Sequence, residues 1–270
     1  MIRRHRTLTA AFAAGALLFF SCRRERRELQ PRDGFLLVSL VWAVLPAFGM
    51  LPLIFFLPEL SVTDAYFEAV SGLTTTGATT LTGLDQLPTS INVWRCFMVL
   101  MGGMGILVLA VAILPLLGVG GKQLFKAETP GPMKDSKMTP RIAETAKGLW
   151  LVYLAVTVAC VLCYRWAGMD WFDAVCHTFS TMGLGGFSTQ DASFGHFNSP
   201  AIEGVAIVFM LVAGMYFGPR FLAVSGRSLK PYRHDPEAVW FLGVTLLSIV
   251  VVAMYIWKDG VYPDLDTAMR

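Results

Sequence analysis

Charged residues are scarce in this chain of 270 residues, and their scarcity argues against an ordinary soluble fold. Only 15% of the residues are charged, against about 25% in globular domains, and 55% are hydrophobic. The five cysteines supply no disulfide framework. Cys160 and Cys163 form a C-x-x-C pair, but it lies in an apolar run, where buried thiols are expected. The composition therefore indicates a protein of the lipid bilayer.

Long apolar runs stand where charge is missing. A helix needs about 20 apolar residues to cross a membrane. Leu8–Cys22 fits either a short first span or a signal-like segment, and the arginines that follow it favour the span. Five further runs reach this length, or approach it with apolar flanks: Phe35–Leu57, Cys96–Gly121, Leu149–Tyr164, Val205–Gly218 and Ala238–Trp257.

Lysine and arginine are absent from alternate loops, and this absence predicts the orientation. Neither residues 58–94 nor residues 166–219 contain lysine or arginine, although both segments contain acidic side chains. Positively charged loops stay in the cytoplasm, so we expect these two segments on the outer, periplasmic side of the inner membrane. The net charge of +3 then reflects topology. Membrane lipid is the expected surrounding, and no nucleic-acid partner is expected.

The polar stretch SGLTTTGATTL, residues 71–81, belongs to an internal repeat. A shift of 109 residues places residues 61–80 on residues 170–189 with five identities in twenty and no gap. The identical pairs are Asp64 with Asp173, Ala65 with Ala174, Ser71 with Ser180, Gly77 with Gly186, and Thr80 with Thr189.

Each copy begins with a helix-start signal. Ser61 precedes Asp64 by three residues, and Asp170 precedes Asp173 by three, as in a capping box. The helix-compatible residues that follow are too few to cross a bilayer. Each copy therefore predicts a short re-entrant helix, followed by a glycine-containing loop that points back into the protein.

The composition of the two loops favours a cation. Irregular backbone at membrane depth is tolerated only where it is buried in protein or lines an aqueous cavity. Gly77 and Gly186 can adopt φ values that other residues avoid, and rings of carbonyls can replace the hydration shell of an alkali cation. The negative ends of two re-entrant helices and the acidic outer segments add attraction for positive charge.

This succession of span, short helix, glycine-containing loop and span resembles the Trk/Ktr/HKT superfamily of potassium transporters, above all the bacterial Trk-type uptake subunit. The segments that carry the resemblance are DAYFEAVSGLTTTGATTL, GGMGILVLAVAILPLLGVGG, KAETPGPMKDSKMTPRIAETAK, FDAVCHTFSTMGLGGFSTQDASFGHFNSPAIE and GVYPDLDTAMR. The resemblance implies an all-α integral membrane fold, in which four span–pore-helix–filter-loop–span units surround one potassium-channel-like pore. It implies a transporter and not an enzyme.

The resemblance also implies the site residues and the partners. Gly77 and Gly186 become the filter glycines, potassium is the transported ion, and no cofactor is implied. A homodimer gated by a cytosolic nucleotide-binding ring is implied, with residues 118–147 and 220–236 as candidate contacts. The expected carbonyl ligands are Thr74, Thr75, Thr76, Gly77, Gly183, Leu184, Gly185 and Gly186, with potassium at Thr75, Thr76, Gly77, Gly185 and Gly186.

The repeat also predicts the organisation of the chain. A third copy begins at Pro236, and its filter glycine would fall twelve residues after Ala268, near position 280 and past residue 270. We therefore expect two complete units and the start of a third. The alternative to conduction is a non-conducting fragment or membrane scaffold. The predicted divisions are an N-terminal segment (1–30), a first unit (31–121), a linker (122–139), a second unit (140–225) and a partial third unit (226–270).

Three features beside the loops are expected to be structural. Glu68 is expected to pair with Arg95, at the outer start of the following span. His177, which matches Glu68 in the repeat, is expected to be a hydrogen-bonded packing residue. The small residues of Gly102–Ile106 are expected to allow close helix packing beside the pore.

Overall fold

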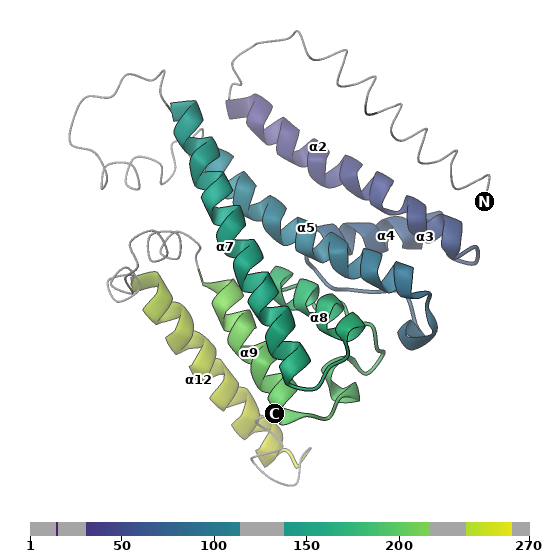
Figure 1. The fold of residues 1–270 in the computed structure, drawn as a ribbon, viewed down its shortest axis with the longest axis vertical. Helices are drawn as coiled ribbons and strands as arrows, with labels where there is room; N and C mark the ends of the chain where they lie inside the picture. The colour runs from purple at the N-terminus through teal and green to yellow at the C-terminus, as the bar shows by residue number, and fades with distance from the viewer. Residues whose placement is uncertain (1–14, 16–30, 114–137, 216–235, 261–270) are drawn as a thin grey trace.

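The computed structural model of the chain describes residues 15, 31–113, 138–215 and 236–260, and this part contains helices and no strand (Figure 1). The predicted all-α fold is therefore confirmed for these residues. In chain order the elements are α2 (Pro31–Gly49), α3 (Leu51–Phe56), α4 (Val62–Leu73), η1 (Leu84–Gln86), α5 (Thr89–Ile113), α7 (Met138–Trp166), α8 (Trp171–Gly183), η3 (Ser193–His196), α9 (Pro200–Gly214) and α12 (Pro236–Lys258).

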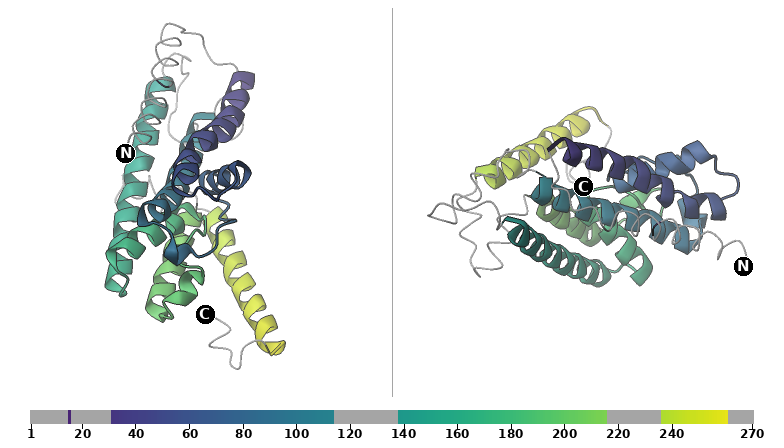
Figure 2. Two further views of the ribbon diagram at one scale, coloured as in Figure 1. Left: turned by 90° about the vertical axis from the view of Figure 1, so that its right-hand side faces the viewer. Right: turned by 90° about the horizontal axis from the view of Figure 1, so that it is seen from above.

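Three helical segments are long and apolar enough to cross a membrane: Leu36–Phe56 across α2 and α3, Lys147–Trp166 in α7, and Val239–Lys258 in α12. α12 lies at the edge of the bundle in both views of Figure 2. α9 is apolar but has only 15 residues, and α5 has 25. Within the described residues, three of the five predicted spans are thus recovered as long apolar helices, and the other two lie in α5 and α9.

The helices that contain the other two apolar runs begin before the runs themselves. α5 begins at Thr89 and α9 at Pro200, several residues before Cys96 and Val205. Apolar runs miss these first turns because helices commonly open on polar residues or on proline, whose missing N–H would have no partner there. The ends predicted at Gly121 and Gly218, and nearly all of the N-terminal run, lie outside the described residues.

The two predicted re-entrant helices are present as α4, with 12 residues, and α8, with 13. We call them the pore helices. The side chain of Ser61 accepts a hydrogen bond from the N–H of Asp64 at 3.1 Å, and Asp170 accepts one from the N–H of Asp173 at 3.0 Å. The predicted capping residues therefore start both helices.

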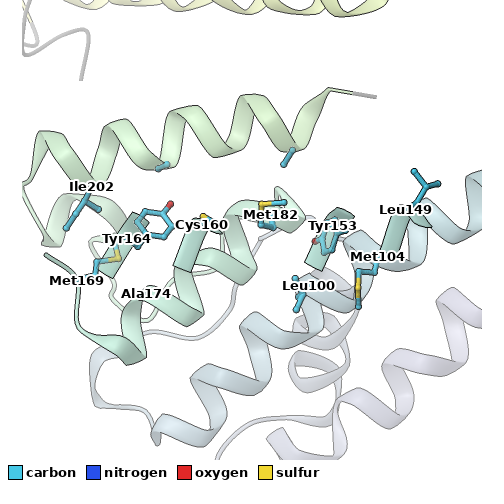
Figure 3. Packing of buried hydrophobic residues seen from close by; sticks show 12 residues of the cluster. Leu100, Met104, Leu149, Tyr153, Cys160, Tyr164, Met169, Ala174, Met182 and Ile202 are labelled. Carbon is cyan, nitrogen blue, oxygen red and sulfur yellow. The ribbon is translucent and has the colours of Figure 1, made fainter. Parts of the chain in front are cut away.

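Each pore helix is bound to the span that precedes it. The hydroxyl of Tyr66 in α4 donates to the carbonyl of Ala43 in α2 at 2.9 Å. In the second unit the hydroxyls of Tyr164 in α7 and Thr181 in α8 lie 2.7 Å apart. Tyr164 belongs to a buried cluster that joins α5, α7, α8 and α9 and includes Leu100 and Met182 (Figure 3).

α5 packs against both pore helices at points where only glycine fits. A methyl group on Gly102 would overlap the carbonyl oxygen of Leu73, at the end of α4. A methyl group on Gly103 would lie 2.9 Å from the hydroxyl of Tyr153 and 3.0 Å from the Cα of Gly183, at the end of α8. The predicted packing role of Gly102–Ile106 is confirmed.

Gly102→Ala should destabilise the protein, whereas Gly105→Ala should not. The added methyl at position 102 meets backbone that cannot move aside, and overpacking of this kind costs about 1–3 kcal/mol. At position 105 the nearest atom, on Trp42, is 3.9 Å away, so alanine gains helix propensity without a clash. Thermal unfolding in detergent tests the pair. Equal melting temperatures for the two variants would contradict the packing role of Gly102.

Candidate functional site

Both pore helices end in the same backbone motif. Thr75 and Leu184, one repeat length apart, each have φ of 56°. Around them the chain forms a Schellman motif, in which two N–H groups beyond the helix return to carbonyls in its last turn. The bonds are Thr75 N–H to Gly72 O (3.1 Å), Thr76 N–H to Ser71 O (2.9 Å), Leu184 N–H to Thr181 O (3.3 Å) and Gly185 N–H to Ser180 O (3.0 Å).

A second positive φ follows two residues later in each loop. Gly77 has φ of 77° and Gly186 has φ of 76°, so the expected backbone conformation of both glycines is confirmed. The positive φ of Thr75 and Leu184 was not predicted, because the sequence offers no glycine at either position. Such a conformation costs a residue with a Cβ about 1–2 kcal/mol. The two loops, residues 74–80 and 183–189, therefore share one unusual backbone path; we call them the first and second filter loops.

The two filter loops touch each other at a predicted site residue. A methyl group on Gly77 would overlap the carbonyl oxygen of Gly185. A methyl group on Gly185 would overlap the side chain of Val99 in α5, whereas one on Gly186 would meet nothing within 4 Å. Each glycine is thus required for a different reason: loop contact at 77, helix packing at 185, and backbone conformation alone at 186.

The other expected ligands are distributed along the two loops. Thr76, Leu184 and Gly186 are exposed, whereas Gly183 and Gly185 are buried against α5. Among the described residues no group of three His, Cys, Asp or Glu side chains is placed to hold a metal ion. The side-chain oxygen atoms of the two loops are the hydroxyls of threonine and of Ser188.

The predicted Glu68–Arg95 pair is confirmed, and it lies behind the first filter loop. Arg95 approaches Oε1 of Glu68 at 2.7 Å, and both side chains are fully buried. The hydroxyl of Thr79 donates to Oε1 of Glu68 at 2.9 Å, and the N–H of Thr80 donates to Oε2 at 3.3 Å. The carboxylate of Glu68 thus binds the end of the first filter loop, at Thr79 and Thr80, and the guanidinium of Arg95.

His177 holds the second filter loop in the matched position. Its Nδ1 lies 2.9 Å from the carbonyl oxygen of Asp173, so Nδ1 carries the proton, and Nε2 accepts from the hydroxyl of Ser188 at 3.1 Å. The ring is buried, and both of its nitrogens contact neutral groups, so these bonds need no charge on the imidazole. The hydroxyl of Thr189 donates to the carboxylate of Asp173 at 2.6 Å. The predicted packing role of His177 is confirmed.

Asp191 joins the two units, and its role was not predicted. Its carboxylate accepts hydrogen bonds from the N–H of Gly83 at 2.8 Å and of Leu84 at 3.0 Å, at the start of η1. The donors precede the acceptor by more than 100 residues. No local pattern signals such a contact, since the donors are backbone groups of another unit.

Comparison with known proteins identifies the family of this chain. The sequence model of TrkH, described as a cation transport protein, matches residues 3–256. The chain belongs to this family. The TrkH family relatives include the "Trk system potassium uptake protein TrkH" of Salmonella typhimurium, which is 53% identical over 98% of this chain and 55% of the relative. "Trk system potassium uptake protein TrkG" of Escherichia coli is 41% identical over 95% of this chain and 53% of the relative.

A solved TrkH structure has the same fold. The potassium transporter TrkH from Vibrio parahaemolyticus superposes with a TM-score of 0.85 and 46% identity, covering 98% of this chain and 54% of that one. The all-α, potassium-channel-like fold that the family resemblance implied is therefore confirmed. The chain spans about half the length of the curated relatives that it matches.

Gly77→Ala should be more harmful than Gly186→Ala. Both substitutions place a Cβ on a backbone with φ near 77°, which costs about 1–2 kcal/mol. Only the first adds a collision with the carbonyl oxygen of Gly185. We expect a larger loss of thermal stability for Gly77→Ala, measured on the purified chain in detergent. The reverse order would show that the two filter loops do not meet as described.

Asp191→Ala should loosen the outer contact between the units. The loss should be about 1 kcal/mol, below the range of about 1.5–3 kcal/mol for bonds to a charged group, because Asp191 is exposed and solvent weakens the bonds. Asp85→Ala, at another exposed aspartate of the same outer segment, is the control. Hydrogen exchange at Gly83 and Leu84 should quicken only in Asp191→Ala. Unchanged exchange there would contradict the contact.

Proposed function

We propose that the two filter loops are two quarters of a potassium-selective filter, through which the complete protein takes up K⁺ across the inner membrane. The observation that supports this most directly is the repeated backbone path. Two loops with matched positive φ values at positions 75 and 77, and at 184 and 186, meet where Gly77 lies against the carbonyl of Gly185. Irregular backbone at membrane depth is tolerated only where it is buried in protein or lines a water-filled cavity. Carbonyls that line such a cavity can bind a cation.

In the proposed filter, carbonyl oxygens replace the water around K⁺, and no covalent step or cofactor is involved. The C-terminal ends of both pore helices lead directly into the loops, so their partial negative charge favours a cation. The proposed ligands are the carbonyls of Thr74, Thr75, Thr76, Gly77, Gly183, Leu184, Gly185 and Gly186.

The proposal includes the setting of the pore. The loop charges support pore loops on the periplasmic side, with acidic residues that concentrate cations at the mouth. The family resemblance supports four units around one pore, a homodimer, and a cytosolic nucleotide-binding ring against the cytoplasmic loops. The chain contributes the first two units, with divisions at residues 31–121 and 140–225. The relatives named as potassium uptake proteins support the choice of ion.

Growth of a bacterium without its own potassium uptake tests the proposal. Expression of the complete protein should restore growth at low K⁺, and Gly77→Asp in it should abolish the rescue, because the carboxylate would project against the Gly185 carbonyl. Gly195→Asp is the matched control: it adds the same charge at an exposed outer glycine with nothing within 4 Å, and should leave growth intact.

The outcome separates conduction from its alternative. No rescue by the complete protein, although it is stably inserted in the membrane, would overturn the proposal. Rescue by the complete protein but not by residues 1–270 expressed alone would favour the alternative for this chain, a non-conducting scaffold that needs further units. Rescue that survives Gly77→Asp would show that the ion passes elsewhere.

A further inference from the structure

We propose that Arg95 is a positioning residue that sets the spacing between the two filter loops, and through this spacing the preference for K⁺ over Na⁺. The inference rests on the proposed function of the loops. It concerns a side chain that lies behind the filter and offers no oxygen atom to an ion.

The guanidinium of Arg95 contacts both loops at once. Its Nη2 lies 3.2 Å from the hydroxyl of Thr79 in the first loop, and its Nη1 donates to the carbonyl of Ser188 in the second at 3.3 Å. The guanidinium carbon also lies 4.5 Å from the ring centre of Phe187. Glu68 holds the other side of the group at 2.7 Å.

The two contacted residues occupy equivalent positions in the loops. Thr79 follows Gly77 by two residues, and Ser188 follows Gly186 by two, since the repeat length is 109 residues. Arg95 therefore links the same point of two neighbouring filter segments. A planar guanidinium can serve several acceptors in fixed directions, whereas the ammonium of lysine acts as a single point charge.

The link is specific to the boundary between the first two units. The 109-residue shift aligns Arg95 with Gly204, and Glu68 with His177. In the second unit a neutral imidazole holds Ser188 from behind, without a cation. The first loop is held from behind by the Glu68–Arg95 ion pair. The guanidinium of this pair also contacts the second loop, at the carbonyl of Ser188.

The charge of Arg95 is compatible with a cation site only because Glu68 cancels it. Both side chains are fully buried, and an unpaired buried charge is costly. With the pair intact, the guanidinium adds no net positive charge behind the filter. Its remaining effect is geometric: it holds the loops, whose carbonyls must keep the distance that suits one ion.

Arg95→Lys is the main test. Lysine keeps the positive charge beside Glu68 but lacks the planar guanidinium, whose two terminal nitrogens contact the two loops. Arg165→Lys is the matched control, since Arg165 lies at the outer end of α7 and donates to the carbonyl of Met169, away from the filter loops. The midpoint of thermal unfolding of the purified complete protein, titrated with KCl or NaCl, gives an apparent affinity for each ion. Hydrogen exchange of residues 183–190 reports the second loop independently of any ion.

Arg95→Lys should lower the K⁺ to Na⁺ affinity ratio about tenfold and quicken exchange in residues 183–190 about tenfold or more, the size expected for losing one hydrogen bond to a charged group. Arg165→Lys should leave both unchanged. A wild-type ratio and wild-type exchange in a folded Arg95→Lys would overturn the inference while the proposed function stands. A complete wild-type protein without preference for K⁺ would overturn the proposed function, and the role of Arg95 in discrimination with it.

A double substitution keeps the inference testable if Arg95→Lys does not fold. Glu68→Gln with Arg95→Gln removes both buried charges, so the double variant should be more stable than either single one. It also removes the guanidinium from Ser188. If stability recovers and the K⁺ preference does not, the positioning role is supported. If both recover together, Arg95 serves only the stability of the fold.

Discussion

The close approach of α5 to the ends of both pore helices is the constraint on which the rest of the structure depends. Short helices that stop within a membrane protein must place their last carbonyls and the following loop where other protein groups support them. Gly102 and Gly103 let α5 lie directly on Leu73 and Gly183, the final residues of α4 and α8. One helix thereby sets the depth at which both loops begin, and a larger side chain at either position would separate them.

Two chemically different supports then hold two similar loops. The buried Glu68–Arg95 pair holds the first loop, and the neutral His177–Ser188 hydrogen bond holds the second. The repeat therefore preserves backbone geometry more faithfully than side-chain chemistry. This is physically reasonable, because a carbonyl-lined site requires a particular backbone path but accepts any support that is buried and fully hydrogen-bonded. Asp191 adds a further contact between the two units, through hydrogen bonds to the backbone at Gly83 and Leu84.

Much of the fold and part of the site were predictable from sequence. The capped pore helices, the glycines at 77 and 186 and the Glu68–Arg95 pair follow from local spacing or from the 109-residue shift. The starts of α5 and α9 were not predicted, because apolar runs omit polar first turns. The positive φ of Thr75 and Leu184 was also missed, since residue type there disfavours the conformation that the Schellman bonds impose. The ion-binding role of the loops stays a prediction.

The sequence by itself determined the membrane class, the order of spans and pore helices, and the equivalence of the two loops, because hydrophobic run length, capping spacing and repetition act locally along the chain. Only the tertiary structure decided that Gly77 faces Gly185, that Arg95 reaches Ser188, and that Asp191 binds the backbone at Gly83. These contacts join residues about 90 to 110 positions apart. They depend on how helices pack in three dimensions, which no spacing within a single segment encodes.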